Sequence, residues 1–278
     1  LLQQLFIGPL SGFIPEISTV VVAAAGPIEE AKRCLPPNIN WTIELRELSS
    51  VFPGRCVYLI NDFAAQAYAC LSPVKASAKR ILPGAETATG PLAVIGAGTG
   101  LGKAALVFRD DGGPIVIPSE GGHSSFPAER LEEWEILDFV KSRTSASYVT
   151  CEDLVSGRGL SHIHAYCTGE DVSPEQAASG LLSDGRTLEL AARFYGRVCR
   201  NFALEVYATG GVYVAGGVAA KNPVLVQHRA FAEAFWDSAV YGELLRRIPL
   251  YLLDDQQSGL WGAAYLGSIE DQRIQNAR

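Results

Sequence analysis

The sequence predicts an α/β fold, because segments typical of buried strands and segments typical of amphipathic helices alternate along the chain. Two observations carry this prediction. Residues 17–25, 56–60 and 92–95 are apolar and lack polar alternation, and the first is rich in β-branched side chains, as strands buried on both faces are. Apolar side chains recur at helical spacing in 129–143 and 187–208.

The order of the elements supports a chain that alternates between sheet and helix. The predicted strands are 17–25, 56–60, 92–95, 103–108, 212–215 and 250–253. The predicted helices are 64–71, 129–143, 187–208 and a closing helix that begins at 260. Gly26-Pro27 ends the first strand and Gly210-Gly211 ends the long helix, because glycine and proline interrupt regular structure.

The helix at 129–143 is expected to bury one apolar face. The residues of this face are Leu131, Trp134, Leu137 and Phe139. Acidic residues come early in this helix and basic residues late, which suits the helix dipole. The polar stretch at 72–90 is expected to cross between two domains.

Length, charge and cysteine spacing exclude several classes of protein. A chain of 278 residues suits one large domain or two modest ones, and 48% apolar residues exclude a disordered chain. The net charge of −7 argues against a general nucleic-acid binder, which needs a basic face. No apolar run approaches the roughly 18–20 residues that a membrane helix needs. Six scattered cysteines without a CxxC pair predict reduced thiols in the cytoplasm.

The glycine-rich loop at 96–102 carries the first chemical signal. Its alternating glycines remove the Cβ atoms that would keep the backbone away from phosphate oxygens. The dinucleotide motif needs glycine where Leu101 stands, and a Walker loop needs Ser or Thr where Ala104 follows Lys103. Both of those loops open a helix, whereas this one joins two predicted strands. A plain flexible hairpin is the alternative, and we favour phosphate binding.

Asn61-Asp62 is the second signal, because it follows the end of a predicted buried strand. Ligands bind at the carboxyl ends of strands in open α/β sheets. A carboxylate there can accept a hydroxyl proton during phosphoryl transfer, and a neighbouring amide can orient a sugar. An aspartate before an Ala-rich helix is also a common helix cap, and from this dipeptide alone the cap is the simpler interpretation.

Residues 119–123 and Glu152 complete the set of candidate residues. Two glycines between Glu120 and His123 permit a tight turn that brings both side chains onto one ligand. Carboxylate and imidazole groups suit sugar hydroxyls, which both donate and accept hydrogen bonds. The alternative is a polar loop. Glu152 by itself indicates no more than an acid at the start of a helix.

Taken in order, these segments resemble the bacterial-type glucokinase family, part of the hexokinase and actin-like ATPase class. The matching segments lie in the family's order between residues 20 and 264: VVVAAAGPI, LINDFAAQAYA, GAGTGLG, PSEGGHSSF, CEDLVSGRGL, GGVYVAGGV and IPLYLL…GLWGAA. No single segment is decisive, but the ordered set is specific. The resemblance implies two α/β, actin-like ATPase (ribonuclease H-like) domains flanking a cleft. The small domain would hold residues 1–73 plus 258–278, and the large domain residues 74–257.

The resemblance also implies roles for particular residues. Asp62 would be the catalytic base for transfer of phosphate from ATP, with Mg²⁺, to the 6-hydroxyl of glucose. The sugar-contacting positions would be Asn38, Asn61, Glu120, His123 and Glu152. The nucleotide-binding positions would be Gly98, Thr99, Gly100, Gly216 and Gly217. No residue is assigned to a metal. The expected setting is glycolysis in the cytoplasm, without a nucleic-acid or membrane partner, and a homodimer is left open.

Three features of the sequence depart from this family or its relatives. The family opens with a strand that carries an Asp-x-Gly-Gly-Thr phosphate loop, and no such segment is present, so we expect the chain to begin after it. Pro37 replaces the Thr of the family's TNxxW pattern. Related repressor-type sugar kinases follow their Glu-x-Gly-His element with a cysteine-rich zinc motif, but no cysteine lies between His123 and Cys151. The alternatives to glucokinase are a non-catalytic sugar-binding or regulatory protein of this fold, or a kinase for another hexose or for an acyl group.

Overall fold

The computed structural model describes residues 17–37, 39–85, 88–180 and 185–276. The chain divides into two compact units, Leu1–Lys75 with Gln257–Arg278 and Ala76–Gln256. The boundaries expected from the sequence lay between 73 and 74 and between 257 and 258. Their assignment to the two domains of an actin-like ATPase stays a prediction.

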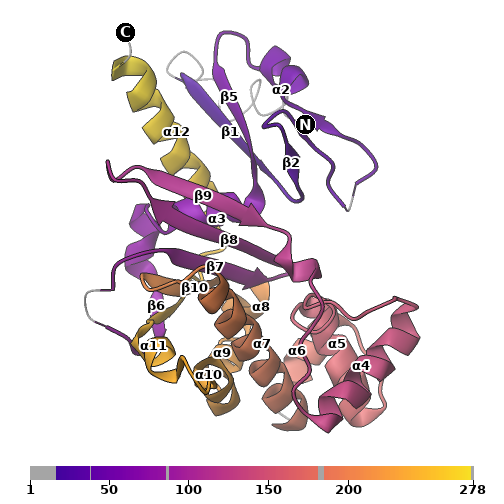
Figure 1. Ribbon diagram of the computed structural model, residues 1–278. Coiled ribbons are helices and arrows are strands. Elements are labelled where there is room, and N and C mark those ends of the chain that lie inside the picture. The colour runs from indigo at the N-terminus through magenta and orange to yellow at the C-terminus, as the bar shows by residue number, and fades with distance from the viewer. Residues whose placement is uncertain (1–16, 38, 86–87, 181–184, 277–278) are drawn as a thin grey trace. The chain divides into compact units, whose positions relative to one another are not determined.

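The first unit is built on two parallel strands, β1 (Thr19–Ala24) and β5 (Cys56–Asn61), as the sequence predicts. Helices α3 (Asp62–Ala69) and α12 (Ser258–Asn276) pack together and α12 also contacts β1 (Figure 1). A Cβ atom at Gly262 of α12 would collide with the carbonyl oxygen of Ala65, so only glycine permits this close approach of the two helices. A small antiparallel sheet and a short helix complete the unit: β2 (Ile28–Glu29), β3 (Arg33–Cys34), β4 (Ile43–Glu44) and α2 (Leu45–Val51).

The second unit contains a mixed six-stranded sheet in the order β6-β11-β10-β7-β8-β9. The strands are β6 (Lys79–Leu82), β7 (Leu92–Ala97), β8 (Leu101–Phe108), β9 (Pro114–Ser119), β10 (Gly211–Ala215) and β11 (Leu250–Leu252). Strand β10 runs parallel to both β7 and β11, whereas β6, β8 and β9 pair antiparallel with their neighbours. The side chains of β7 and β10 are buried throughout, which explains their unbroken apolar sequences.

Helices supply the rest of the second unit. They are α4 (Leu131–Thr144), α5 (Gly157–Thr168), α6 (Pro174–Gly180), α7 (Gly185–Glu205), α8 (Gly217–Lys221), α9 (Val224–Gln227), α10 (Arg229–Trp236) and α11 (Gly242–Arg247). Two 3₁₀ turns, η2 (Pro73–Ser77) and η3 (Gly121–His123), join the elements. The long helix α7 lies in the core of this unit and contacts α5, α9, α10 and β7 (Figure 1).

The structure corrects several details of the predicted elements. Strands β6 and β9 were not expected, and β6 occupies part of the stretch expected to be a crossing between domains. Helix α7 ends at Glu205, before the predicted end at Gly210-Gly211. The expected buried face of α4 is wrong, because Leu131 and Trp134 are 78% and 57% exposed. Instead α4 buries Glu133, Ile136 and Val140, because a buried carboxylate on this face pairs with arginines of α7.

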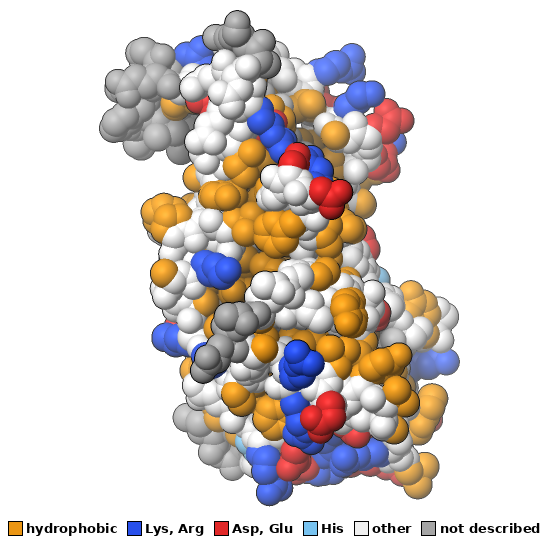
Figure 2. All heavy atoms as spheres, turned by 60° about the vertical axis from the view of Figure 1, so that its left-hand side comes forward, with side chains coloured by type: hydrophobic (Ala, Val, Ile, Leu, Met, Phe, Trp, Pro, Cys, Tyr) orange, Lys and Arg blue, Asp and Glu red, His pale blue; other side chains and the backbone are white. Residues whose placement is uncertain are grey.

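The helices and the surface are relevant to two classes that the sequence argues against, membrane-spanning proteins and nucleic-acid binders. In the described residues, no helix is both long and apolar enough to cross a membrane. On the face drawn in Figure 2, basic and acidic side chains are interspersed, so the described residues form no continuous basic surface there.

A buried ion pair joins α4 to α7. The guanidinium of Arg197 donates two hydrogen bonds to the carboxylate of Glu133, at 2.7 and 2.9 Å. The backbone N–H groups of Glu129 and Arg130 donate to the same carboxylate. Burial raises the pKa of Glu133, but these hydrogen bonds outweigh burial, so the pKa lies below its usual range. The charged pair therefore contributes stability only while Glu133 is ionised.

We predict that Glu133→Gln lowers the free energy of unfolding by about 3–5 kcal/mol at pH 7, because it removes the fully buried carboxylate partner of Arg197 and leaves only the half-buried Glu129 to pair with it. The folded-state pKa of Glu133 is depressed, so its contribution is complete above the unfolded value of about 4.3 and is lost as the pH falls through the folded value. Urea unfolding measured across acidic pH should therefore show a shallower loss for Glu133→Gln than for the unmodified chain.

Asp138→Asn is the matched control for this prediction, since Asp138 is an exposed residue of the same helix. It should change the free energy of unfolding by no more than about 0.5 kcal/mol. Equal stability of Glu133→Gln and Asp138→Asn would show that the buried pair does not hold α4 to α7.

Candidate functional site

The glycine-rich segment forms a tight hairpin between β7 and β8. Gly96 and Gly102 are paired strand residues, so the turn itself spans only residues 98–100 and is shorter than the predicted loop at 96–102. The N–H of Gly98 donates to the carbonyl of Gly100 at 2.8 Å, and the N–H of Gly157 donates to the carbonyl of Gly98, also at 2.8 Å. The backbone of the turn is thus fixed by a helix start more than fifty residues away.

The side chain of Glu152 is hydrogen-bonded to the end of this turn. Its Oε2 accepts a hydrogen bond from the N–H of Leu101 at 3.0 Å. A Cβ atom at Gly100 would lie 2.5 Å from the same oxygen, so the carboxylate approaches the turn only because residue 100 is glycine. The other carboxylate oxygen forms an ion pair with Arg158 at 3.4 Å. The structure therefore brings Glu152 and the glycine turn together.

The Glu120–His123 segment lies against the same place. The N–H of Glu152 donates to the carbonyl of Gly122 at 2.9 Å. A side chain at Gly122 would collide with the carbonyl oxygen of Leu101, so this glycine is required by close packing of η3 on β8. Three segments separated in the sequence converge through Glu152: the turn at 98–100, the turn at 121–123 and the segment that follows Cys151.

The side chains of Glu120 and His123 are exposed and make no hydrogen bond or ion pair within the described chain. They are available to an external ligand that both donates and accepts hydrogen bonds. Burial raises the pKa of the Cys151 thiol, beside Glu152, so this thiol stays protonated at neutral pH and is a poor nucleophile.

Asn61 and Asp62 belong to the first unit and lie where β5 runs into α3. The side-chain oxygen of Asn61 caps α3 by accepting from the N–H groups of Phe63 and Ala64, at 2.9 and 3.1 Å. Its amide nitrogen donates to the carbonyl of Gly26 at 3.1 Å. The helix cap is therefore Asn61, whereas Asp62 is the first residue of α3, half-buried, with one oxygen 2.9 Å from the N–H of Phe63. Asn38 lies outside the described residues.

A cavity of about 460 Å³ in the second unit opens beside the glycine turn. Gly98, Thr99 and Gly217 of the predicted nucleotide-binding set line it. Gly100 and Gly216 do not line it. Each of them instead allows a neighbouring group to approach the backbone closely. Gly216 has a φ of +85°, and a Cβ atom there would lie 2.5 Å from the carbonyl oxygen of Ala97. The volume falls in the range of small-molecule sites.

Two cations that line this cavity were missed by the sequence analysis, Arg158 of α5 and Lys221 of α8. Their signals are weak in the sequence. Arg158 stands next to a glycine in CEDLVSGRGL, and Lys221 lies four residues after Gly217, one helical turn away. Glu175 is the carboxylate that also lines the cavity, and Arg158 pairs with Glu152 and Asp153. The glycine turn and the two cations are the groups at this cavity that suit a ligand carrying phosphate.

Comparison with known proteins assigns the chain to a family. The model of the family described as glucokinase matches residues 11–269. A glucokinase from Nitrobacter hamburgensis is 32% identical over 256 residues, which cover 88% of this chain and 79% of that protein. The crystal structure of a glucokinase from an Antarctic psychrotroph is 27% identical, with a TM-score of 0.80 and coverage of 96% of this chain and 85% of that one.

A more distant structure shares the fold. The ROK family glucokinase from Streptomyces griseus, solved in complex with glucose and AMPPNP, is 20% identical, with a TM-score of 0.62 and coverage of 96% of this chain and 87% of that one. The match of the family model extends over residues of both compact units. The chain belongs to the glucokinase family.

Proposed function

We propose that this chain phosphorylates glucose with Asp62 as general base, with Asn38, Asn61, Glu120, His123 and Glu152 as sugar ligands, and with the cavity beside the glycine turn as the ATP site. The reaction is that of its family, the ATP-dependent conversion of glucose to glucose 6-phosphate. The residue roles are the proposal.

The convergence of three segments on Glu152 is the observation that carries this proposal. The Glu152 carboxylate accepts a hydrogen bond from the turn expected to bind phosphate. The backbone N–H of Glu152 donates to the turn that presents Glu120 and His123. The Glu152 side chain would thus lie between the turn that binds phosphate and the residues that bind the sugar. The glucose and AMPPNP present in the Streptomyces griseus structure are a precedent for both ligands on this fold.

The chemistry requires transfer of one proton and one phosphoryl group. The oxygen of the glucose 6-hydroxyl attacks the γ-phosphorus, the bond to the β,γ-bridging oxygen breaks, and ADP leaves. Asp62 accepts the hydroxyl proton as the new bond forms. The position of Asp62 at the carboxyl end of β5 supports this role, because functional groups of open α/β sheets gather at such strand ends.

The nucleotide site would use backbone groups and cations rather than a cage of carboxylates. Thr99 and the N–H groups of the turn would face phosphate oxygens, with Arg158 and Lys221 at the border of the cavity. In the described residues, no group of three or more His, Cys, Asp or Glu could hold a metal ion. Mg²⁺ in nucleotide sites is held mainly by phosphate and water oxygens, and it would neutralise the charge that develops on the transferring phosphate.

The remaining expectations are part of the same proposal. The two compact units would be the two domains of an actin-like ATPase, and the enzyme would act in glycolysis in the cytoplasm. None of the six cysteines forms a disulfide bond in the described structure, which fits a reducing compartment. A homodimer stays a prediction.

Asp62→Asn should lower kcat by about 10²–10⁴-fold and leave the dissociation constant of glucose nearly unchanged, because the amide keeps the shape but cannot accept the proton. Coupled detection of ADP gives kcat, and calorimetry gives glucose binding. Asp110→Asn, at an exposed position of the β8–β9 turn, is the control and should behave as the unmodified chain. If Asp62→Asn keeps most of its kcat, the assignment of the base is wrong.

Glu120→Gln and His123→Ala should raise the KM for glucose with little change in the KM for ATP. Both side chains are exposed and lack partners in the described structure, so these substitutions remove ligand contacts without disturbing the fold. Loss of one hydrogen bond to a sugar hydroxyl should cost about tenfold in KM. Steady-state kinetics with each substrate varied in turn tests this, and equal losses for ATP and glucose would contradict the assignment.

Gly98→Ala and Gly100→Ala form a matched pair for the ATP site. A methyl group at position 98 meets no atom within 4 Å, so it should leave glucose binding and thermal stability unchanged. It should nevertheless weaken ATP binding by about tenfold or more, since phosphate must approach this backbone. A methyl group at position 100 collides with Glu152 and should weaken glucose binding as well. Unaltered ATP affinity in Gly98→Ala would exclude the turn as the phosphate site.

A further inference from the structure

The residue before the glycine turn, Ala97, lies just beyond the end of a strand pairing. Strand β10 pairs with β7 as far as Ala215, which stands opposite Gly96. A Cβ atom at Gly216 would lie 2.5 Å from the oxygen and 3.0 Å from the nitrogen of Ala97, so the backbone of Ala97 faces Gly216. The ladder of β10 has ended at this point, and a buried backbone N–H here needs another acceptor.

A tyrosine hydroxyl of the long helix α7 supplies that acceptor. The N–H of Ala97 donates to the Tyr195 hydroxyl at 3.2 Å, across 98 positions of the chain. Tyr195 is 2% exposed, and burial raises the pKa of its hydroxyl, so the group is neutral at physiological pH. Tyr195 therefore holds the backbone at the start of the turn, as Glu152 does at its end.

The ring of Tyr195 is fixed by its packing on α10. It meets the ring of Phe231 edge-on, with the ring centres 5.9 Å apart. A Cβ atom at Gly196 would lie 2.2 Å from the carbonyl oxygen of Phe231, so α10 approaches α7 this closely only because residue 196 is glycine. The hydroxyl is thus delivered by a side chain that has little freedom to move.

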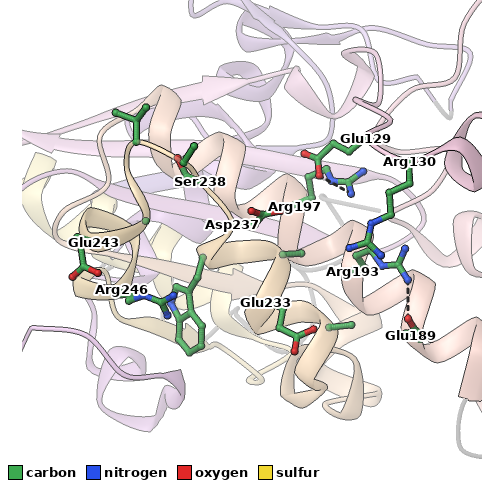
Figure 3. A pocket seen from close by; sticks show the side chains of 16 residues that line it. Glu129, Arg130, Glu189, Arg193, Arg197, Glu233, Asp237, Ser238, Glu243 and Arg246 are labelled. Atoms are coloured by element: carbon green, nitrogen blue, oxygen red, sulfur yellow. Dashed lines mark hydrogen bonds and ion pairs between the residues drawn. The ribbon is translucent and has the colours of Figure 1, made fainter.

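Helix α7 is also anchored on the side away from Tyr195. Arg197 follows Tyr195 by two residues, which places it on the opposite side of a helix with 3.6 residues per turn. Its guanidinium pairs with Glu133 of α4 and with Glu129, and Figure 3 shows the pair with Glu129. Rotation of α7 about its axis would break these ion pairs, so the position of Tyr195 is set from both sides of the helix.

Two of the segments proposed to bind ATP meet at Ala97. The turn at 98–100 begins directly after it, and Gly216 lies against its backbone. The next residue, Gly217, lines the proposed nucleotide cavity, whereas Tyr195 does not line it. A displaced Ala97 peptide would move the turn and press on Gly216, so Tyr195 can affect a bound nucleotide only through Ala97.

We propose that Tyr195 is a positioning residue for ATP, whose hydroxyl fixes the Ala97 peptide and through it the phosphate-binding turn and the segment at Gly216. This inference rests on the proposed function, in which that turn binds the phosphates of ATP. Backbone N–H groups bind phosphate best when they already point at it, because ordering them on binding costs free energy. The hydroxyl touches no substrate and takes part in no proton transfer.

Tyr195→Phe tests the proposal, because it removes the hydroxyl and keeps the ring. The Ala97 N–H then stays buried without its acceptor. We expect the KM for ATP and the dissociation constant of AMPPNP to rise about tenfold, while kcat and the dissociation constant of glucose change by less than about twofold. Steady-state kinetics and calorimetry measure these quantities. Unaltered ATP affinity in this variant would refute the proposal.

Two control variants separate positioning from a loss of stability. Tyr166→Phe makes the same change in the same unit, but it breaks a hydrogen bond from Tyr166 to Glu135, which joins α5 to α4 away from the turn. Ile136→Val shortens a fully buried side chain of α4 and should lower the melting temperature. Neither should change ATP affinity. If Ile136→Val weakened ATP binding as much as Tyr195→Phe, the effect would be one of general stability and the proposal would fail.

Hydrogen exchange at the Ala97 amide, followed by NMR without ligand, reports the bond itself. Exchange should be at least about tenfold faster in Tyr195→Phe than in the unmodified chain, and unaltered in Tyr166→Phe. Because this measurement does not involve ATP, it keeps two failures apart. Unchanged exchange in Tyr195→Phe would overturn this inference, whereas unaltered ATP affinity in Gly98→Ala would overturn the proposed phosphate site.

Discussion

The contact between the Glu152 carboxylate and the backbone of the glycine turn is the interaction on which the candidate site depends. Residues 101 and 152 are 51 positions apart, and a single hydrogen bond of 3.0 Å joins them. The bond is possible because Gly100 has no side chain to keep the carboxylate away. The N–H of Glu152 also holds Gly122, so one residue sets the position of two turns. Glu152 therefore positions both the turn proposed to bind phosphate and the turn proposed to bind the sugar, which lie in the second unit.

This arrangement gives the candidate site a physical link between its two proposed substrates. The carboxylate assigned to the sugar also accepts from the turn assigned to phosphate and pairs with Arg158, which lines the nucleotide cavity. A partly buried carboxylate that accepts hydrogen bonds from Leu101 and Arg158 is held in place, and ligands held in place lose little entropy when substrate binds. The fold can therefore present the two groups in a fixed relation, although each comes from a different segment of the chain.

The buried charge in the core is compensated by other groups of the protein, whereas Glu120 at the candidate site is exposed. Glu133 is fully buried and is compensated by Arg197 and by two backbone N–H groups, so it ties α4 to α7. This same pair explains why the apolar pattern of α4 misleads. A helix is expected to bury its Leu and Trp residues, but here the buried face is organised around a carboxylate, and Leu131 and Trp134 are left exposed. Local apolar periodicity cannot reveal a partner 64 residues away.

The sequence by itself determined the α/β class, the central strands β1, β5, β7, β8, β10 and β11, and the long helix α7, because these depend on the local pattern of apolar residues. It also identified the glycine turn and the Glu120–His123 turn, because glycine spacing is visible locally. Only the tertiary structure decided that Asn61 caps α3, that Glu152 clasps the turn, and that Arg158 and Lys221 border the cavity. The edge strands β6 and β9 also emerged only there, since β6 begins with the exposed residues Lys79 and Arg80 and β9 contains two prolines, which weaken the pattern of a strand. The physical reason is common to all of these: a hydrogen bond or ion pair between distant segments depends on where the folded backbone places them, and no local pattern records that distance.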